Sequence, residues 1–63
     1  MKNRIKELRE NRNLTQEDLA KLLGTSRQTI ISLEKEKYSP SIMLAYKISK
    51  IFNKKIEEVF IFE

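Results

Sequence analysis

Apolar residues recur at helical spacing between Thr15 and Glu34, and the pattern predicts two short helices joined by a tight turn at Gly24-Thr25. The first helix would begin at Thr15 and end at the glycine. Its apolar positions are Leu19, Ala20, Leu22 and Leu23. This stretch is the most clearly patterned part of the chain, and we expect the remaining segments to pack around it.

The second of these helices, expected from about 27 to 35, has two different faces. One face carries Thr29, Ile30 and Leu33. At about 100° per residue, the opposite face carries Arg27, Gln28, Ile31, Ser32 and Lys35. We therefore expect this helix to bury its apolar face and to present a polar, cationic face to solvent or to a partner.

Capping residues set the ends of both helices. The Thr15 hydroxyl can accept a hydrogen bond from the N–H of Asp18, and Ser26 can cap the second helix in the same way. Gly24, the only glycine of the chain, can adopt the left-handed conformation that ends many helices. Because only two residues separate Leu23 from Ser26, the two helices must cross at a steep angle, as in a helix-turn-helix unit.

Two further helices flank this unit. The first is expected over residues 3 to 12, with Asn3 as its cap and with Ile5 and Leu8 on its buried side. The other is expected from about Ile42 to Phe52, after a loop at 36–41 in which proline blocks helix continuation. Its apolar stripe is a strong core signal.

The C-terminal segment, about 54–63, is unusually apolar. A single-turn helix would place Ile56, Val59 and Phe60 on one face, whereas Phe60-Ile61-Phe62 favours extended structure and a short β-strand. So many apolar residues are not expected to find cover within so small a chain. We interpret Ile56, Val59, Phe60, Ile61 and Phe62 as a dimerisation seam; the alternative is that the segment folds onto its own core.

Length and composition narrow the class of protein. The 63 residues allow one domain, which buries only about 60% of the surface of its unfolded chain, so oligomerisation is the expected source of further burial. The chain has no cysteine and no histidine, which argues against disulfides, the common metal sites, a cofactor and an enzyme. No apolar run approaches the roughly 18 residues of a membrane span, so a soluble cytoplasmic protein is expected.

Charge suggests a class of partner. Lys and Arg number 13 against 9 Asp and Glu, which gives a net charge of +4 and a pI of about 9.6. This excess favours a polyanion as partner. The alternative is that the lysines serve solubility alone.

The apolar, turn and polar positions together resemble those of Cro/C1-type (Xre-family) helix-turn-helix regulators over residues 4 to 60. The matching residues are Leu14-Thr15-Gln16, Leu19-Ala20, Leu23-Gly24, Ser26-Arg27-Gln28-Thr29-Ile30, Leu33-Glu34 and Tyr38-Ser39-Pro40-Ser41. The resemblance implies an all-α, compact, lambda-repressor-like bundle of four to five short helices. It also implies that the helix at 27–35 enters the major groove of double-stranded DNA.

Chemistry and the resemblance together suggest the base-reading residues. The resemblance assigns base edges to the positions of Arg27, Gln28 and Ser32. Arg27 can donate two hydrogen bonds to guanine, and Gln28 can pair in the same way with adenine. A phosphate contact is the alternative for Arg27. Ile31 is expected to contact a thymine methyl group; otherwise it is an isolated exposed apolar residue.

A second set of residues is expected to hold the DNA backbone. Gln16, at the start of its helix, can donate to a phosphate oxygen, although an ordinary exposed glutamine is the alternative. The loop that follows the reading helix is implied to track the same backbone. The expected phosphate contacts are Gln16, Ser26, Thr29, Lys35, Lys37, Tyr38 and Ser39. The resemblance also implies an ion pair between Arg9 and Glu34.

Two positions depart from the family pattern. Glu36 stands where many relatives have glycine, so it must either adopt a left-handed conformation, at roughly 1 kcal/mol, or end the helix differently. Met43 stands where relatives often carry a polar residue, which removes one possible backbone contact. The sequence predicts a homodimeric regulator, a repressor of an inverted-repeat operator. The alternative is a protein-interaction module or antitoxin-type protein that also binds DNA.

Overall fold

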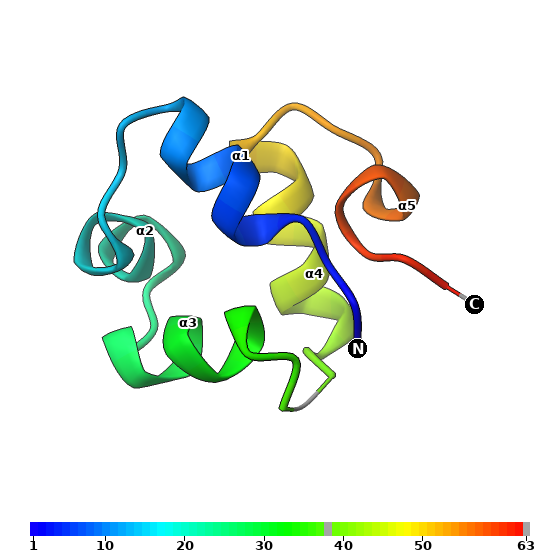
Figure 1. Ribbon diagram of the computed structural model, residues 1–63, viewed down its shortest axis with the longest axis horizontal. Helices are drawn as coiled ribbons and strands as arrows, with labels where there is room; N and C mark the ends of the chain where they lie inside the picture. The colour runs from blue at the N-terminus through cyan, green and yellow to red at the C-terminus, as the bar shows by residue number, and fades with distance from the viewer. Residues whose placement is uncertain (38, 63) are drawn as a thin grey trace.

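Five short helices build the fold of the described part of the chain, residues 1–37 and 39–62 of a computed structural model. Figure 1 shows α2 and α5 on opposite sides of the bundle, with the other three helices between them. The predicted all-α bundle is confirmed. The helices are α1 (Ile5–Asn11), α2 (Gln16–Leu23), α3 (Arg27–Glu34), α4 (Ile42–Ile51) and α5 (Ile56–Val59).

Local capping fixes the helix-turn-helix unit formed by α2 and α3. The Thr15 hydroxyl accepts from the N–H of Asp18 at 2.9 Å, and the Asp18 carboxylate accepts from the N–H of Thr15 at 2.9 Å. These hydrogen bonds lower the pKa of Asp18, so this part of the stability is lost only as the pH falls through that lowered value. Gly24 is left-handed with φ 68°, and Ser26 caps α3, as predicted.

The first helix is shorter than predicted because Asn3 serves another element. Helix α1 begins at Ile5, not at residue 4, and the side chain of its N-cap residue, Arg4, makes no capping hydrogen bond. The Asn3 amide donates to the carbonyl of Leu33 at 2.8 Å, while its oxygen accepts from the N–H of Ile5 at 3.1 Å. Asn3 therefore joins the start of α1 to the last turn of α3.

The end of α3 carries the backbone strain that the sequence suggested. Glu36 is left-handed, with φ 61°, directly after the turn that closes the helix. The N–H of Glu36 donates to Leu33 and that of Lys37 donates to Ser32, each at 3.0 Å. These hydrogen bonds satisfy carbonyls of the last turn, and they offset the cost of a left-handed glutamate.

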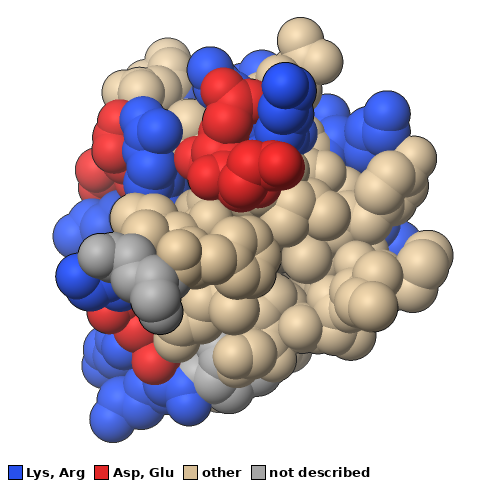
Figure 2. All heavy atoms as spheres, turned by 90° about the vertical axis from the view of Figure 1, so that its right-hand side faces the viewer, with Lys and Arg blue, Asp and Glu red and all other residues tan. Residues whose placement is uncertain are grey.

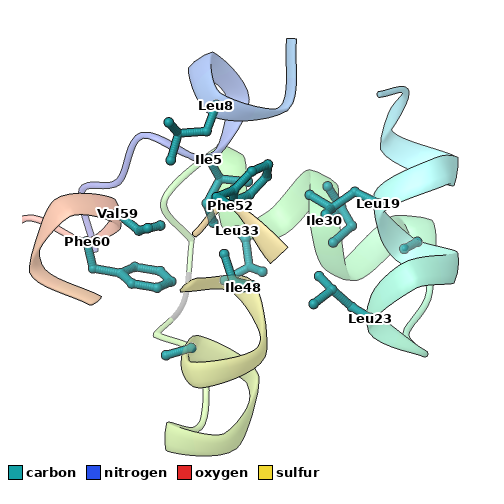
Figure 3. Packing of buried hydrophobic residues seen from close by; sticks show 12 residues of the cluster. Ile5, Leu8, Leu19, Leu23, Ile30, Leu33, Ile48, Phe52, Val59 and Phe60 are labelled. Atoms are coloured by element: carbon teal, nitrogen blue, oxygen red, sulfur yellow. The ribbon is translucent and has the colours of Figure 1, made fainter. Parts of the chain in front are cut away.

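The core contains residues from all five helices, and the C-terminal segment supplies part of it. Figure 3 shows Val59 and Phe60 pointing inward toward Ile48 and Phe52 of the α4 region. Val59 and Phe60 are 0% and 1% exposed, so the expectation that they face outward in a seam is wrong. The single-chain fold covers them because α5 packs against α4.

The predicted C-terminal strand is also not formed among the described residues. Phe60 makes one isolated antiparallel bridge to Asn3 and continues no further ladder. Two hydrogen bonds flank the bridge, from Arg4 N–H to the Val59 carbonyl at 2.8 Å and from Ile61 N–H to the Lys2 carbonyl at 2.9 Å. The apolar run is extended at this point, and the pairing seen within residues 1–37 and 39–62 is with the segment before α1.

A nearly buried ion pair ties α1 to α3. Arg9 Nε donates to Glu34 Oε2 at 2.7 Å, and Arg9 Nη2 donates to Glu34 Oε1 at 3.3 Å. A third hydrogen bond runs from Arg9 Nη1 to the Leu14 carbonyl at 2.7 Å. The two side chains are 10% and 6% exposed, and the hydrogen bond to Glu34 raises the pKa of Arg9. The structure thus contains the pair that the resemblance implied.

No helix in the described ranges is both long enough and apolar enough to cross a membrane.

We expect Phe60→Ala to cost about 3–5 kcal/mol of unfolding free energy, because it leaves a large cavity under α5. A 63-residue domain has only roughly 3–9 kcal/mol to lose, so this loss is a large fraction of its total stability. Phe62→Ala is the matched control, with a change of about 0.5 kcal/mol or less because Phe62 is exposed. Urea unfolding followed by circular dichroism measures both, and equal losses would contradict the placement of Phe60 in the core.

We expect Arg9→Ala to lower the unfolding free energy by about 3 kcal/mol, because it leaves the Glu34 carboxylate buried without its cation. Arg4→Ala is the control, since Arg4 pairs with Glu7 at 3.2 Å on the exposed surface and should matter far less. The same urea titration compares them. A loss no larger than that of Arg4→Ala would mean that the buried pair does not hold the fold.

Candidate nucleic-acid interface

The outer face of α3 presents the residues predicted to read bases. Ile30 and Leu33 are fully buried and fix the rotation of the helix about its axis. As a result, Arg27 and Gln28 are exposed at the N-terminal end of α3. Ile31 and Ser32 lie half-buried on the same face. A partner that binds along this face of α3 could therefore contact all four side chains.

Gln16 lies beside this face and is held in place. The side chains of Gln16 and Arg27 line one shallow hollow between the starts of α2 and α3, together with Arg9, Thr15 and Glu17. Gln16 Nε2 donates to Glu34 Oε1 at 3.1 Å. An amide nitrogen carries two hydrogens, so one remains to donate to an anion in the hollow. The Glu17 carboxylate also lines this hollow and adds a negative charge to it.

The link between Gln16 and Glu34 is a feature that the sequence did not predict. Glu34 accepts hydrogen bonds from Arg9 of α1 and from Gln16 of α2, while it belongs to α3 itself. One carboxylate therefore fixes three helices relative to one another. Arg9 neutralises its charge, so Glu34 does not oppose an anion beside Gln16. No local pattern signals this contact, because it exists only once the three helices have met.

The hydroxyls of Ser26 and Thr29 lie at the start of α3, where Ser26 is exposed and Thr29 is half-buried. Ser26 Oγ accepts from the N–H of Thr29 at 3.1 Å and lies 2.9 Å from Thr29 Oγ1. One of the two hydroxyls donates to the other, so the second keeps its hydrogen for an acceptor outside the protein. Capping thus uses much of the hydrogen-bonding capacity of this pair, but leaves one donor.

The other end of α3 is cationic. Lys35 and Lys37 are both exposed, on either side of the left-handed Glu36, and Ser39 of the following loop is exposed as well. Tyr38 lies outside the described residues. An eight-residue helix is about 12 Å long, so this cationic end stands well apart from Gln16 and Ser26. Donors for an extended anion therefore flank the exposed face at both ends.

Beside the loop that follows α3 lies a surface of uncharged side chains, which we call the uncharged surface and define as Met1, Pro40, Ile42, Ile56, Ile61 and Phe62; Lys2 and Ser39 line its edge. Figure 2 shows this side as a broad area of uncharged side chains, with charged side chains of both signs along its border. Ile42 is 85% and Phe62 63% exposed. The structure brings the outer residues of the predicted seam together with the start of α4, which sequence reasoning did not include.

The sequence of this chain is similar to those of known proteins over its full length. A family model described as helix-turn-helix matches residues 5–59, which span all five helices. An HTH-type transcriptional regulator of Methanocaldococcus jannaschii is 64% identical over 63 residues, which cover 100% of this chain and 96% of the relative. An HTH-type transcriptional regulator of Archaeoglobus fulgidus is 59% identical over 63 residues, covering 100% of this chain and 89% of the relative.

The similarity extends beyond archaea. An HTH-type transcriptional regulator of Bacillus subtilis is 48% identical over 60 residues, which cover 95% of this chain and 91% of the relative. The exposed polar face of α3, the capped turn before it and the full-length similarity point to one assignment. The chain belongs to the Cro/C1-type helix-turn-helix family of DNA-binding transcriptional regulators.

Proposed function

We propose that the protein is a cytoplasmic, homodimeric repressor that places α3 in the major groove of an inverted-repeat operator. The observation that carries the proposal is the exposed pair Arg27 and Gln28 at the start of α3, beside a Gln16 amide that Glu34 holds in position. A rigid donor next to two base-reading side chains sets the register of the helix on the duplex.

Each residue on the exposed face of α3 has a proposed contact with a base. Arg27 donates two hydrogen bonds to O6 and N7 of a guanine, and Gln28 pairs with N6 and N7 of an adenine. Ile31, half-buried on the same face, keeps enough apolar surface to contact a thymine methyl group. Ser32 can donate to or accept from a base edge. These four residues lie on one face of α3, and together they would contact the few base pairs of one half-site.

Backbone contacts would hold the helix from both ends. At one end, Gln16 and one hydroxyl of the Ser26–Thr29 pair donate to phosphate oxygens. At the other end, Lys35 and Lys37 contribute positive charge, followed by Tyr38 and Ser39 of the loop. These contacts are independent of base sequence, and they make binding dependent on salt.

The uncharged surface supports a homodimer. Its exposed apolar residues, chiefly Ile42 and Phe62, lie outside the core and line one hollow together with Ile56 of α5. A two-fold axis through this surface would pair it with the same surface of a second copy. Two reading helices would then meet half-sites about 34 Å apart, one turn of DNA. Val59 and Phe60 take no direct part, because they are buried within each copy.

A second candidate function rests on the same surface. An antitoxin-type protein would use Ile42 and Phe62 to dock a different protein while still binding DNA through α3. Double substitution of Arg27 and Gln28 with alanine separates the two functions. If repression is lost while the fold is intact, DNA reading carries the function; if only substitutions on the uncharged surface abolish it, docking does.

We expect Arg27→Ala to weaken operator binding by about 1–3 kcal/mol and to relax the preference at one base position, because it removes a bidentate contact. Lys37→Ala is the control and should weaken all sequences alike, with a shallower dependence on salt. Selection from a random DNA pool at two salt concentrations measures both. A uniform loss for Arg27→Ala would make Arg27 a phosphate contact instead.

We expect Phe62→Lys and Ile42→Lys to convert a dimer into a monomer, because each buries a charge at the proposed two-fold interface. Affinity for the inverted repeat should fall by roughly 10²-fold, while affinity for a single half-site changes little. Sedimentation at micromolar concentration and titration of both DNAs measure this. The control is Leu22→Lys, another exposed apolar position away from this surface. A wild-type protein that is monomeric both free and on DNA would refute the dimer.

A further inference from the structure

A second apolar hollow lies between the last turn of α2 and the second half of α4, and we call it the lysine-rimmed groove. Leu22, Tyr46 and Ile51 supply its apolar lining, and Lys21, Lys47 and Lys50 supply its rim. It shares no residue with α3 or with the uncharged surface. It is therefore a separate surface, which neither DNA reading nor the proposed dimer uses.

Two large side chains of the apolar lining are exposed to solvent. Leu22 is 59% and Tyr46 is 49% exposed, and they lie together with the half-buried Ile51 in one concave site. Single exposed apolar residues are common, but a contiguous apolar patch with a polar rim is typical of a protein-binding site. The core is complete without these two side chains, since neither belongs to the buried cluster.

The rim is cationic, and its charge is only partly compensated within the described residues, by an electrostatic interaction of Lys21 with Asp18 of the same helix that contributes to the lowered pKa of Asp18. None of the three lysines forms an ion pair in the described part of the chain, and no carboxylate lines the groove. Lys50 Nζ lies 5.5 Å from the centre of the Tyr46 ring, a cation–π contact that holds positive charge beside the apolar lining. The groove thus combines apolar area with three positive charges.

DNA is a poor occupant of this groove. The groove begins at the C-terminal end of α2, and Gln16 begins the same helix about 12 Å away. A phosphate backbone would satisfy the lysines, but it would leave Leu22 and Tyr46 against charged oxygens. An amphipathic helix with apolar residues on one face and carboxylates along its sides would satisfy both parts of the groove.

We propose that the lysine-rimmed groove binds an acidic amphipathic helix of a partner protein. Charge complementarity selects the acidic partner and steers its approach, and burial of Leu22 and Tyr46 supplies the apolar contact. Because the groove shares no residue with α3, the partner and DNA can be bound at the same time. The proposal does not depend on the dimer or on the base-reading assignments.

The test uses the full chain, labelled with ¹⁵N, and two synthetic helical peptides as probes. Both peptides carry leucines at positions i, i+4, i+7 and i+11; one has glutamates along the flanks of this stripe, and the other has lysines. We expect the acidic peptide to cause saturable amide shifts centred on Leu22, Tyr46 and Lys50. It should bind at least about tenfold more tightly than the basic peptide, and more weakly as salt rises.

Variants show whether the groove itself is responsible. Lys50→Glu and Leu22→Gln should each weaken the acidic peptide, while Lys6→Glu on α1 is the charge-matched control and should change little. All three positions are exposed, and a well-dispersed NMR spectrum verifies that each variant is folded. Two groove variants are included so that the other still tests the proposal if one fails to fold. Weakening by the groove variants alone supports the proposal.

Other outcomes overturn it. The proposal is wrong if the acidic peptide gives no saturable shift, or if its shifts centre on Ile42 and Phe62. It is equally wrong if the basic peptide binds as well as the acidic one, because apolar adhesion alone would then explain the contact. If random-sequence duplex DNA produces the same shifts at Leu22 and Lys50, the groove is part of the DNA interface instead.

Discussion

The ion pair between Arg9 and Glu34 is the interaction on which the rest of this structure depends. It joins α1 to α3, and the same carboxylate also holds Gln16 of α2. An apolar pair of similar size could stabilise a domain as well as a buried ion pair does. An apolar pair could not accept the hydrogen bond from the Gln16 amide, which holds that amide at the hollow beside Arg27. The pair therefore links the stability of the bundle to the geometry of its DNA-binding face.

The small size of the chain explains how the two termini contribute. A domain of 63 residues has little core to spare, and its last helix is a single turn of four residues. That turn is held by the burial of Val59 and Phe60 and by backbone hydrogen bonds to the segment before α1. The C-terminal segment is thus part of the core first, and among its described apolar residues Ile61, Phe62 and the half-buried Ile56 keep surface for a partner.

The exposed surface divides into three regions of different chemistry. The α3 face combines the exposed side chains that we propose to read bases with hydrogen-bond donors and lysines at its two ends, a combination that suits DNA. The uncharged surface around Ile42 and Phe62 suits a second copy, and the lysine-rimmed groove suits an acidic helix. A net charge of +4 does not distinguish these regions. In the functions that we propose, their separation would allow one small domain to contact DNA and proteins through different residues.

The sequence by itself determined the helix-turn-helix unit, because its signals are local: the Thr15 capping box, the left-handed Gly24 and the Ser26 cap each act within one turn of the chain. It also located the exposed face of α3, since periodicity fixes which residues oppose Ile30 and Leu33. Only the tertiary structure decided that Val59 and Phe60 are buried, that Asn3 reaches Leu33 and that Glu34 holds Gln16. Those contacts join residues far apart in sequence, so they depend on how the helices pack, which no local pattern encodes.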